Sequence, residues 1–302
     1  MSTDFEILVA GGGIAGLTAG LVAARLGRST LILTGDQLGG NLLSIEKIEG
    51  YPGFPDGVAG FELCPIAQGQ AAEAGAEFET AEVLDLRAGD GTWTVATAAG
   101  DFAAGAVILA TGSSLRTLGV PGEEQFKGKG VSHCASCDAP LLRERPVMVI
   151  GGGDSACQEA LTLAAAASQV TLVHRGAELS AQASYRDRLR SHPKIALRFN
   201  TAVEAILGGD AVTGVRLGDG AAISADGVFI YVGLAPNTAF LDGKLALDSD
   251  GRIPTDSEMR TGLAGVFAAG SVRAGWPGRA VAAAGDGTAA AMAAHRFLEG
   301  GA

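Results

Sequence analysis

The sequence predicts an α/β fold with two Rossmann-like domains of the three-layer ββα kind, the second inserted into the first. Two copies of a strand–glycine turn–helix–strand pattern predict it, one at residues 5–34 and one at residues 146–175. The length of 302 residues suits two domains of ordinary size. We expect the outer domain to comprise residues 1–115 and 245–302, and the inserted domain to comprise residues 116–244.

The composition disfavours several classes of function. Acidic residues outnumber basic residues by 33 to 22, which gives a net charge of −11. Such a surface disfavours nucleic acid and anionic membranes as partners, because both require clustered Lys and Arg. The apolar run over residues 7–26 is interrupted by three glycines, and no basic segment precedes it, so we expect neither a membrane span nor a signal peptide. We therefore expect a soluble cytoplasmic protein.

The first unit begins with the apolar run Phe5–Ala10, FEILVA, which is typical of a buried strand. Gly11, Gly13 and Gly16 follow at the spacing G-x-G-x-x-G, ahead of a helical stretch to about Leu26 and a second strand, STLILT. Glycines in such a turn let a pyrophosphate approach the backbone, and the start of the helix offers it free N–H groups and a partial positive charge. The spacing therefore predicts a dinucleotide site in the outer domain.

The second unit repeats these features in the inserted domain. The strand PVMVI leads into Gly151, Gly153 and Ala156 at the spacing G-x-G-x-x-A, and a helix and the strand QVTLVHR follow. One turn of this kind is weak evidence, because glycine-rich turns are common, but two copies with the required strand and helix around each are specific. The second strand of the first unit ends without the acid that usually binds the ribose, and that of the second unit ends at His174-Arg175.

Two further strands run into turns that are typical of cofactor contacts. The segments AVILATGSSLR and GVFAAGSV each end an apolar run on a turn of small residues, and an alanine-rich helical stretch follows the second. Because the first and last parts of the chain complete one domain, we expect the chain to cross between domains twice, near residues 114–116 and 243–246. The turn residues are Ala110, Thr111, Gly112, Gly270 and Ser271.

Cys134 and Cys137 form the motif C-A-S-C, and Asp138 follows at once. Half of a zinc site, or two unreactive buried thiols, are alternative interpretations. A zinc site needs a second C-x-x-C or a spaced His pair, and the other two cysteines and the four histidines show no such spacing. A redox dithiol is the third interpretation, because N–H groups at the start of a helix lower the pKa of one thiol and the pair can cycle to a disulfide. Asp138 could move the proton that this exchange requires.

Motifs along nearly the whole chain occur in the order and at the spacing of one family. On these motifs the sequence resembles the low-molecular-weight thioredoxin reductases, a branch of the flavin-dependent disulfide oxidoreductases. The motifs are GGGIAGL at Gly11, LGGNL at Leu38, IEGYPGFP at Ile48, ATGSSLR at Ala110, VPGE at Val120, GVSHCASCDAP at Gly130, IGGGDSA at Ile150, YVGLAPNT at Tyr231 and GVFAAGS at Gly265.

The resemblance implies an FAD-dependent enzyme that is normally a homodimer. It implies that Cys137 lies against the isoalloxazine, that Cys134 attacks the partner disulfide and that Asp138 is the acid catalyst. It also implies that the inserted domain rotates, which brings either the dithiol or the nicotinamide to the flavin. The residues expected to bind FAD are Gly11, Gly13, Ile14, Ala15, Gly16, Gly39, Gly40, Asn41, Val83, Ala110, Thr111, Gly112, Gly270, Ser271, Arg279, Ala280 and Val281. The residues expected to bind the nicotinamide nucleotide are Gly151, Gly153, Asp154, Ser155, Ala156, His174 and Arg175.

The sequence departs from the family at the nicotinamide site. Family members that use NADPH have the pattern H-R-R-x-x-x-R, whose arginines bind the 2′-phosphate. This chain has Gly176 and Ser180 at two of the three arginine positions, and Glu178 between them adds an acid. We therefore expect a weak or reversed preference for NADPH over NADH, unless an arginine of the segment YRDRLR takes over.

The flavin site departs from the family too. Ser271 stands where the family usually has an Asp that accepts a hydrogen bond from the ribityl chain, and Gly278-Arg279 stands where it has Arg-Gln. Asn41 replaces the Gln of G-G-Q, and Gly50 replaces the Asn of E-N-Y-P-G. FAD is still expected, with altered binding strength and redox tuning.

The leading function hypothesis is an FAD-dependent reductase of thioredoxin or of a small disulfide substrate, with electrons from NADH or NADPH. A second hypothesis keeps the flavin and the dithiol but takes electrons from ferredoxin or a deazaflavin, or runs in reverse as a dithiol oxidase that uses oxygen. A third is a flavin-binding protein without turnover, which the intact C-A-S-C-D motif disfavours. No metal site is predicted.

Overall fold

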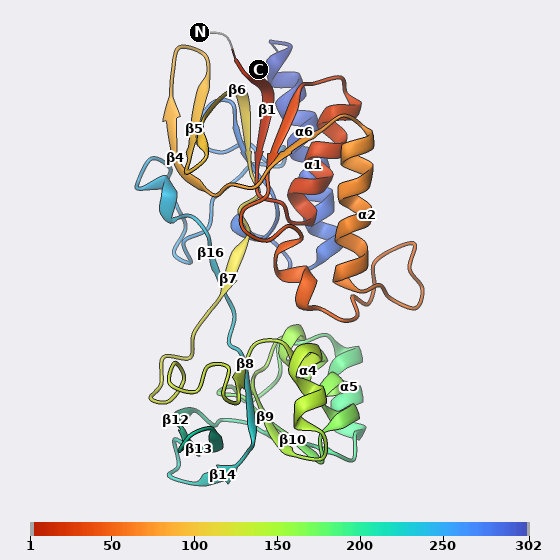
Figure 1. The fold of residues 1–302 in the computed structure, drawn as a ribbon, viewed down its shortest axis with the longest axis vertical. Coiled ribbons are helices and arrows are strands. Elements are labelled where there is room, and N and C mark those ends of the chain that lie inside the picture. Colours follow the sequence, from red (N-terminus) through yellow and green to blue (C-terminus); the bar gives the residue numbers. More distant parts are fainter. Residues whose placement is uncertain (1–2, 301–302) are drawn as a thin grey trace. The chain divides into compact units, whose positions relative to one another are not determined.

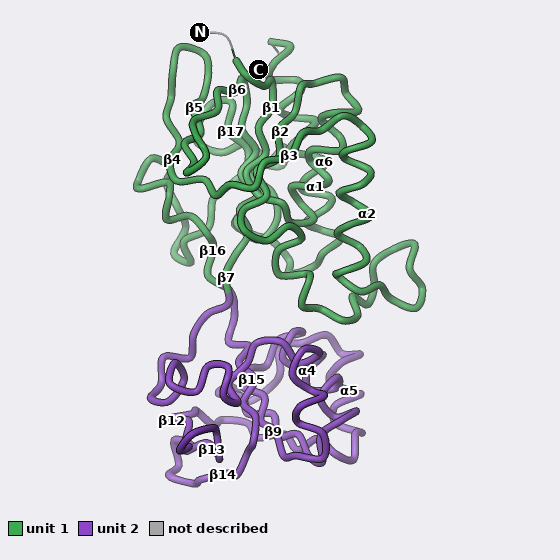
Figure 2. Tube along the Cα trace, in the orientation of Figure 1, with its two compact units in different colours: residues 1–114, 235–302 green, residues 115–234 purple. Residues whose placement is uncertain are grey.

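The structure is a computed structural model that describes residues 3–300, and it divides the chain into two compact units. Unit 1 contains residues 1–114 and 235–302, and unit 2 contains residues 115–234 (Figure 2). The insertion of one Rossmann-like domain into another is therefore confirmed. Among the helices of residues 3–300, none is long and apolar enough to cross a membrane.

Unit 1 is a mostly parallel sheet with its three α-helices on one face (Figure 1). Its elements are β1 (Phe5–Ala10), α1 (Ile14–Arg25), β2 (Thr30–Leu33), η1 (Gly40–Ser44), α2 (Gly60–Glu73), β3 (Glu77–Glu79), β4 (Val83–Ala88), β5 (Trp93–Thr97), β6 (Gly100–Leu109), η3 (Ala239–Leu241), β17 (Val266–Ala268), η4 (Gly270–Val272) and α6 (Ala280–Leu298). The strand order is β3-β2-β1-β6-β5-β4, and β17 also pairs with β6.

The central strand β1 explains why this sheet has a core on each face. Successive residues of a strand point to opposite faces. Ile7 and Val9 accordingly lie in the core shared with α1, α2 and α6, whereas Leu8 and Ala10 lie in the core formed with β4 and β5. The run FEILVA is apolar throughout because a parallel strand in this position is buried on both sides.

Unit 2 has a five-stranded parallel sheet between two α-helices and a small antiparallel sheet (Figure 1). Its elements are β8 (Val131–Ser132), α3 (Ala135–Asp138), η2 (Ala139–Leu142), β9 (Pro146–Gly151), α4 (Asp154–Ala166), β10 (Gln169–Val173), α5 (Ala183–Ser191), β11 (Ile195–Arg198), β12 (Val203–Gly208), β13 (Val212–Leu217), β14 (Ala222–Ser224) and β15 (Gly227–Tyr231). The larger sheet has the order β11-β10-β9-β15-β8, and β12-β13-β14 form the smaller one. Val149 faces the helices, and Met148 and Ile150 face the small sheet.

The second crossing between the units differs from the position predicted from the sequence. The structure places it at residues 234/235, not at 243–246, whereas the first lies at 114/115. The strands β7 (Ser113–Leu115) and β16 (Leu234–Pro236) pair with each other, so both crossings occur side by side. Leu241 and Leu245 are then buried in a core of unit 1. This pairing joins segments that are far apart in the chain, so no local pattern reveals it.

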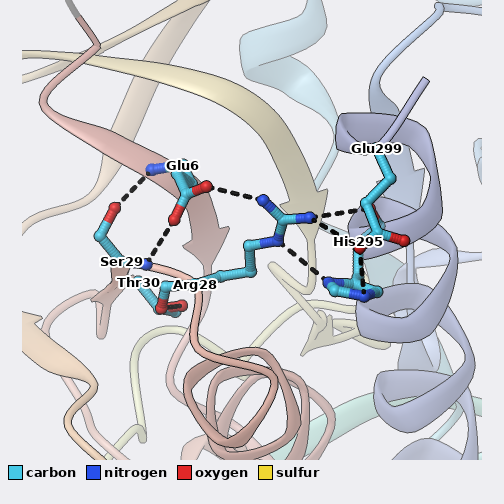
Figure 3. Close-up of polar contacts among 6 residues, drawn as sticks. All are labelled: Glu6, Arg28, Ser29, Thr30, His295 and Glu299. Atoms are coloured by element: carbon cyan, nitrogen blue, oxygen red, sulfur yellow. Dashed lines mark hydrogen bonds and ion pairs between the residues drawn. The ribbon is translucent and has the colours of Figure 1, made fainter.

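A polar cluster connects three segments of unit 1 near the start of β1 (Figure 3). Arg28, between α1 and β2, donates to Glu6 Oε1 at 2.7 Å and to Nδ1 of His295 in α6 at 3.0 Å. Because Nδ1 accepts this bond, the ring proton belongs on Nε2, which is 3.4 Å from Glu299 Oε1. Glu6 Oε2 also accepts the N–H of Ser29 at 3.0 Å. These contacts lower the pKa of Glu6, and the bond from Arg28 is the largest cause.

We expect Arg28→Ala to lower the free energy of unfolding by about 1–3 kcal/mol, because it removes hydrogen bonds to a charged group. The Arg28 side chain is only 16% exposed. Since folding lowers the pKa of Glu6, its contribution is present at neutral pH and is lost as the pH falls through the folded-state pKa. Urea unfolding followed by circular dichroism, at neutral pH and at about pH 3, should show a difference between wild type and variant that shrinks in acid.

Arg87→Ala is the matched control for this prediction. Arg87 pairs with Asp101, but the two side chains are 50% and 52% exposed. Exposed ion pairs contribute little, so this variant should lose less than about 1 kcal/mol. Equal losses in the two variants would contradict a stabilising role for the cluster around Arg28.

Candidate active site

The C-terminal ends of four parallel strands line up at one edge of the unit 1 sheet. Ala10, the last residue of β1, is paired with Leu33 of β2 and with Leu109 of β6, and Ala268 of β17 is also paired with Leu109. Ligands of open α/β sheets bind outside the ends of such strands. Predicted flavin residues that are far apart in the sequence therefore gather in the turns at this edge.

Only glycine fits at one position in the turn after β1 and at one position in the first turn of α1. Gly11 has a φ of +126°, and a Cβ there would lie 2.1 Å from the carbonyl oxygen of Ala110. A Cβ at Gly16 would lie 1.8 Å from the carbonyl oxygen of Gly11. Gly13 differs from both, because, apart from its two neighbours in the chain, no described residue has an atom within 4 Å of its Cβ position. Space is therefore open beside Gly13, the N-cap residue of α1.

The N-termini of α1 and α6 are both suited to an anion. No described side chain caps either helix, and neither first turn contains an acid. Uncapped N–H groups and the helix dipole favour a negative group at such a position. The first turn of α1 includes Ile14 and Ala15, and that of α6 follows Arg279 with Ala280 and Val281.

A second turn, which contains Gly39 and Gly40, lies against the turn after β1. The N–H of Gly39 donates to the carbonyl oxygen of Gly12 at 2.8 Å. Asn41 Nδ2 donates to the carbonyl oxygen of Ser113 at 2.6 Å. Asn41 therefore connects this turn to the segment that follows β6.

The turn after β6 is held by Asn237, a residue that sequence reasoning did not select. Thr111 Oγ1 donates to the carbonyl oxygen of Asn237 at 2.8 Å, and Asn237 Nδ2 donates to that of Thr111 at 2.9 Å. The N–H of Asn237 also donates to the carbonyl oxygen of Gly112 at 3.0 Å. Ala110 is buried before this turn, whereas Val83 is the first residue of β4 and lies in no turn.

The turn after β17 is fixed by Asp286 of α6, which the sequence analysis also missed. Asp286 Oδ2 accepts the N–H of Gly270 at 3.1 Å, and its carboxylate accepts two bonds from Arg273 at 2.7 and 2.8 Å. In the sequence, a lone acid in an alanine-rich helix marks Asp286 as unusual, but nothing there indicates its partners. Ser113 Oγ donates to the carbonyl oxygen of Ser271 at 3.0 Å and lies 3.1 Å from Ser271 Oγ, which joins this turn to the segment after β6.

Cys134 and Cys137 of unit 2 form a disulfide, with their Cα atoms 5.3 Å apart. Cys134 is the N-cap of α3, and its Sγ accepts the N–H of Cys137 at 3.3 Å. An N–H directed at a sulfur stabilises the thiolate that reduction produces. Cys137 is exposed, whereas Cys134 and Asp138, the last residue of α3, are half-buried. The redox interpretation of the C-x-x-C motif is therefore confirmed.

Two neighbours of the disulfide are His133, which contacts β15, and Tyr231, which belongs to β15 and to the core of unit 2. His133 Nδ1 is 2.9 Å from the carbonyl oxygen of Ile230, so its ring is fixed against β15. Tyr231 is buried, and burial raises the pKa of its hydroxyl; the charge of Glu159 on α4 raises it further. Tyr231 therefore stays neutral at physiological pH and has no ionised form to offer to thiol exchange.

The other two cysteines are free and buried. Burial raises the pKa of Cys64 to about 11 and that of Cys157 to about 12. Both therefore remain thiols at neutral pH and are poor nucleophiles. In the described part of the chain, no cluster of three or more His, Cys, Asp or Glu residues has the arrangement of a metal site.

The glycine turn of unit 2 resembles that of unit 1. A Cβ at Gly151, which has a φ of +150°, would lie 2.3 Å from a carbonyl oxygen at the end of β15. Gly153 is the N-cap of α4, and no described side chain caps this helix. Ser155 is exposed in its first turn, and Ala156 is buried beneath it. The geometry of a second dinucleotide turn is thus present.

The loop after β10 folds back over this turn. The N–H of Ser180 donates to the carbonyl oxygen of Gly152 at 2.9 Å. The Asp154 carboxylate accepts bonds from the backbone and side chain of Gln182 at 2.8 and 2.9 Å. His174 fills the space between loop and turn, since a Cβ at Gly152 would lie 2.3 Å from its Nδ1.

One arginine lies on this loop, and three more lie on α5, the helix that follows it. Arg175 and Glu178 are both exposed on the loop. On α5, the Arg188 guanidinium lies 5.7 Å from the centre of the Tyr185 ring, and Arg190 is 3.9 Å from an Asp of the same helix. These two arginines therefore have partners within their own helix.

Known proteins match this chain over its whole length. The model of the pyridine nucleotide-disulphide oxidoreductase family matches residues 5–287. A thioredoxin reductase of Treponema pallidum is 40% identical over 304 residues, which cover 99% of each chain. The structure of Lactococcus lactis thioredoxin reductase matches with a TM-score of 0.94 and 34% identity, over 98% of this chain and 100% of that one. The structure of T. acidophilum thioredoxin reductase matches with a TM-score of 0.92 and 34% identity, over 99% of each chain.

These matches extend over both units, and they include the disulfide and both glycine turns. Similarity of this extent is not confined to the nucleotide-binding fold, which many unrelated enzymes share. The chain therefore belongs to the low-molecular-weight thioredoxin reductase family, among the pyridine nucleotide-disulphide oxidoreductases.

Proposed function

We propose that this enzyme reduces the disulfide of a thioredoxin-like protein or of a small disulfide substrate, with FAD as its flavin and a nicotinamide nucleotide as its electron donor. The Cys134–Cys137 disulfide at the first turn of α3 is the observation that carries the proposal. Because α3 directs an N–H at one of the two sulfurs, the pair is suited to repeated reduction and oxidation.

The turns at the strand ends of unit 1 fit FAD. Gly13 leaves space at the N-terminus of α1, where the backbone N–H groups would bind the pyrophosphate. Ser271 and Asn41 supply hydrogen-bonding groups, and Arg279 supplies a positive charge before α6. Bound FAD would supply a two-electron carrier between a nicotinamide and a disulfide. The residues at this edge of the sheet bind and orient the FAD.

The two cysteines divide the exchange with the substrate between them. The Cys134 thiolate attacks the substrate disulfide, which forms a mixed disulfide and releases one substrate thiolate. The Cys137 thiolate then attacks Cys134 Sγ, which releases the second substrate thiolate and re-forms the disulfide of the enzyme. Asp138, at the end of the same helix, holds and delivers the proton that the departing thiolate takes up.

Exposed apolar side chains suggest where proteins bind. Leu141, in the short helix that follows the disulfide, is 81% exposed, which suits a thioredoxin-like partner that must reach Cys134.

On α2, Phe61 and Ile66 are 57% and 50% exposed, which supports a homodimer that covers this helix. The cytoplasmic location expected from the sequence stays a prediction.

The loop over the second glycine turn supports weak discrimination between NADPH and NADH. Arginines are preferred partners of a 2′-phosphate, because they form two charge-assisted hydrogen bonds to it. Gly176 and Ser180 supply no charge, and Glu178 is exposed on the same loop as Arg175. Each missing contact weakens NADPH binding by about 1.5–3 kcal/mol, or tenfold and more.

The same loop favours one alternative function. If neither nucleotide reduces the flavin well, the electrons come from a protein such as ferredoxin or from a deazaflavin, or the enzyme oxidises dithiols with oxygen. The proposed flavin site of unit 1 and the disulfide suit these reactions equally well, because neither involves the loop after β10.

Gly13→Ala is expected to leave the fold intact and to weaken FAD binding about tenfold or more. The added methyl group would stand in the open space where the pyrophosphate binds. Titration of flavin-free protein with FAD, with circular dichroism as the measure of folding, tests this. Gly11→Ala is the contrasting variant and should lower stability as well, because its Cβ would lie 2.1 Å from the carbonyl oxygen of Ala110. Wild-type affinity in Gly13→Ala would show that the pyrophosphate binds elsewhere.

Cys137→Ser should form a stable mixed disulfide through Cys134, because the thiol that would resolve it is missing. The probe is a single-cysteine thioredoxin activated with thionitrobenzoate, whose release is followed by absorbance. Cys134→Ser should form no such adduct, and both variants should keep FAD, because the cysteines lie in unit 2 and the flavin residues in unit 1. An adduct through Cys137 in Cys134→Ser would assign the attack to the other sulfur.

The electron donor is identified by stopped-flow reduction of the flavin with NADPH and with NADH. We expect the ratio of the two rate constants at low nucleotide concentration to be near one or to favour NADH, because two guanidinium groups are absent. Glu178→Arg should raise the ratio in favour of NADPH, and Glu178→Gln controls for loss of the negative charge alone. A preference for NADPH of about a hundredfold in the wild type, about 2.7 kcal/mol, would show that another arginine binds the 2′-phosphate.

A further inference from the structure

Besides the two cysteines and Asp138, α3 contains a polar side chain that touches the disulfide. Ser136 Oγ lies 3.5 Å from Cys134 Sγ. A disulfide sulfur carries no hydrogen, so the serine hydroxyl is the donor in this contact. The N–H of Cys137 reaches the same sulfur at 3.3 Å. Cys134 Sγ therefore receives two donors from a single helical turn.

We propose that Ser136 is a positioning residue that stabilises the Cys134 thiolate in the reduced enzyme. Reduction breaks the S–S bond with two electrons, and each sulfur then either keeps a negative charge or takes up a proton. A hydroxyl donor binds a thiolate more strongly than a thiol, so Ser136 favours the charged form of Cys134. The proposal rests on the proposed function in one respect, namely that Cys134 is the attacking thiol.

The charges around α3 make these donors important. The titratable groups on α3 and the elements packed around it are His133, Asp138 and Tyr231, together with Asp154, Cys157 and Glu159 of α4. Tyr231 is neutral because burial raises its pKa, and Glu159 and Asp138 raise it further by acting as negative charges beside α3. His133 is fixed by its bond to a β15 carbonyl oxygen. The hydroxyl of Ser136 and the N–H of Cys137 therefore act against the surrounding negative charge.

The test is the pH dependence of Cys134 alkylation by iodoacetamide in the reduced FAD-containing enzyme, after the reductant has been removed without oxygen. Peptide mass analysis assigns the alkylated residue, and the raised pKa values of Cys64 and Cys157 keep these two thiols out of the signal. Ser136→Ala should raise the pKa of Cys134 by about one unit, equivalent to about 1.4 kcal/mol. Ser136→Thr keeps the hydroxyl and should restore the wild-type profile.

Ser132→Ala is the matched control, because Ser132 Oγ accepts the backbone N–H of Cys134 at 3.0 Å and donates to its carbonyl oxygen. It removes a hydroxyl from the same motif that is bonded to the backbone of Cys134, and its shift should be much smaller. An equal shift in Ser132→Ala would mean that distortion of α3 explains the result, and an unchanged pKa in Ser136→Ala would overturn the proposal outright. Failure of Ser136→Thr to restore the profile would overturn it as well.

This experiment is independent of the electron donor and of the substrate, since neither is present. If Cys134 were not the attacking thiol, the trapping experiment with thioredoxin would show it, whereas the alkylation profile of Cys134 would still respond to Ser136. The two failures are therefore distinguishable.

Discussion

The proposed flavin site, at the C-terminal ends of the unit 1 strands, depends on the close approach of Gly11 to the carbonyl oxygen of Ala110. β1 and β6 are paired up to their last residues, so the turns that follow them leave the sheet side by side. No side chain fits between those turns, because a Cβ at Gly11 would lie 2.1 Å from that oxygen. The carbonyl oxygen of Gly11 in turn restricts Gly16 to glycine. Together these contacts let α1 begin directly above the strand ends and aim its N–H groups at the turns.

A second close approach, between α1 and α6, completes the same edge. A Cβ at Gly287 would lie 2.1 Å from the carbonyl oxygen of Ala15, and one at Gly270 would lie 2.9 Å from Ala15 Cβ. Small residues along both helices therefore allow their backbones to pack together. The partial positive charges of two uncapped helix starts are brought to one edge, where an anionic cofactor would compensate them.

Local patterns predicted the elements that depend on local chemistry. The sequence predicts the strand FEILVA, both glycine turns and the redox pair, because each depends on residues that are close together in the chain. Contacts between residues that are far apart in the chain were not predicted. Asp286 accepts hydrogen bonds from Arg273 and Gly270, and Asn237 is hydrogen-bonded to Thr111. The pairing of β16 with β7 places the second crossing at residues 234/235 and not at the predicted position. Each of these depends on which segments the sheet brings together, and a single sequence does not contain that information.

Backbone atoms restrict the glycine turns of both units, whereas side chains help to fix the loop that covers the second turn. In unit 1 the restrictions on Gly11 and Gly16 come from backbone atoms, so most substitutions there would disturb the fold itself. In unit 2 the N–H and the hydroxyl of Ser180 both donate to the carbonyl oxygen of Gly152, and a Cβ at Gly176 would lie 2.8 Å from His174 Nε2. Ser180 and Gly176 therefore take part in fixing the loop, whereas the side chain of Glu178 is exposed. Because Glu178 is exposed, its charge can change at little cost to the fold, and the proposed weak discrimination between NADPH and NADH depends on that charge.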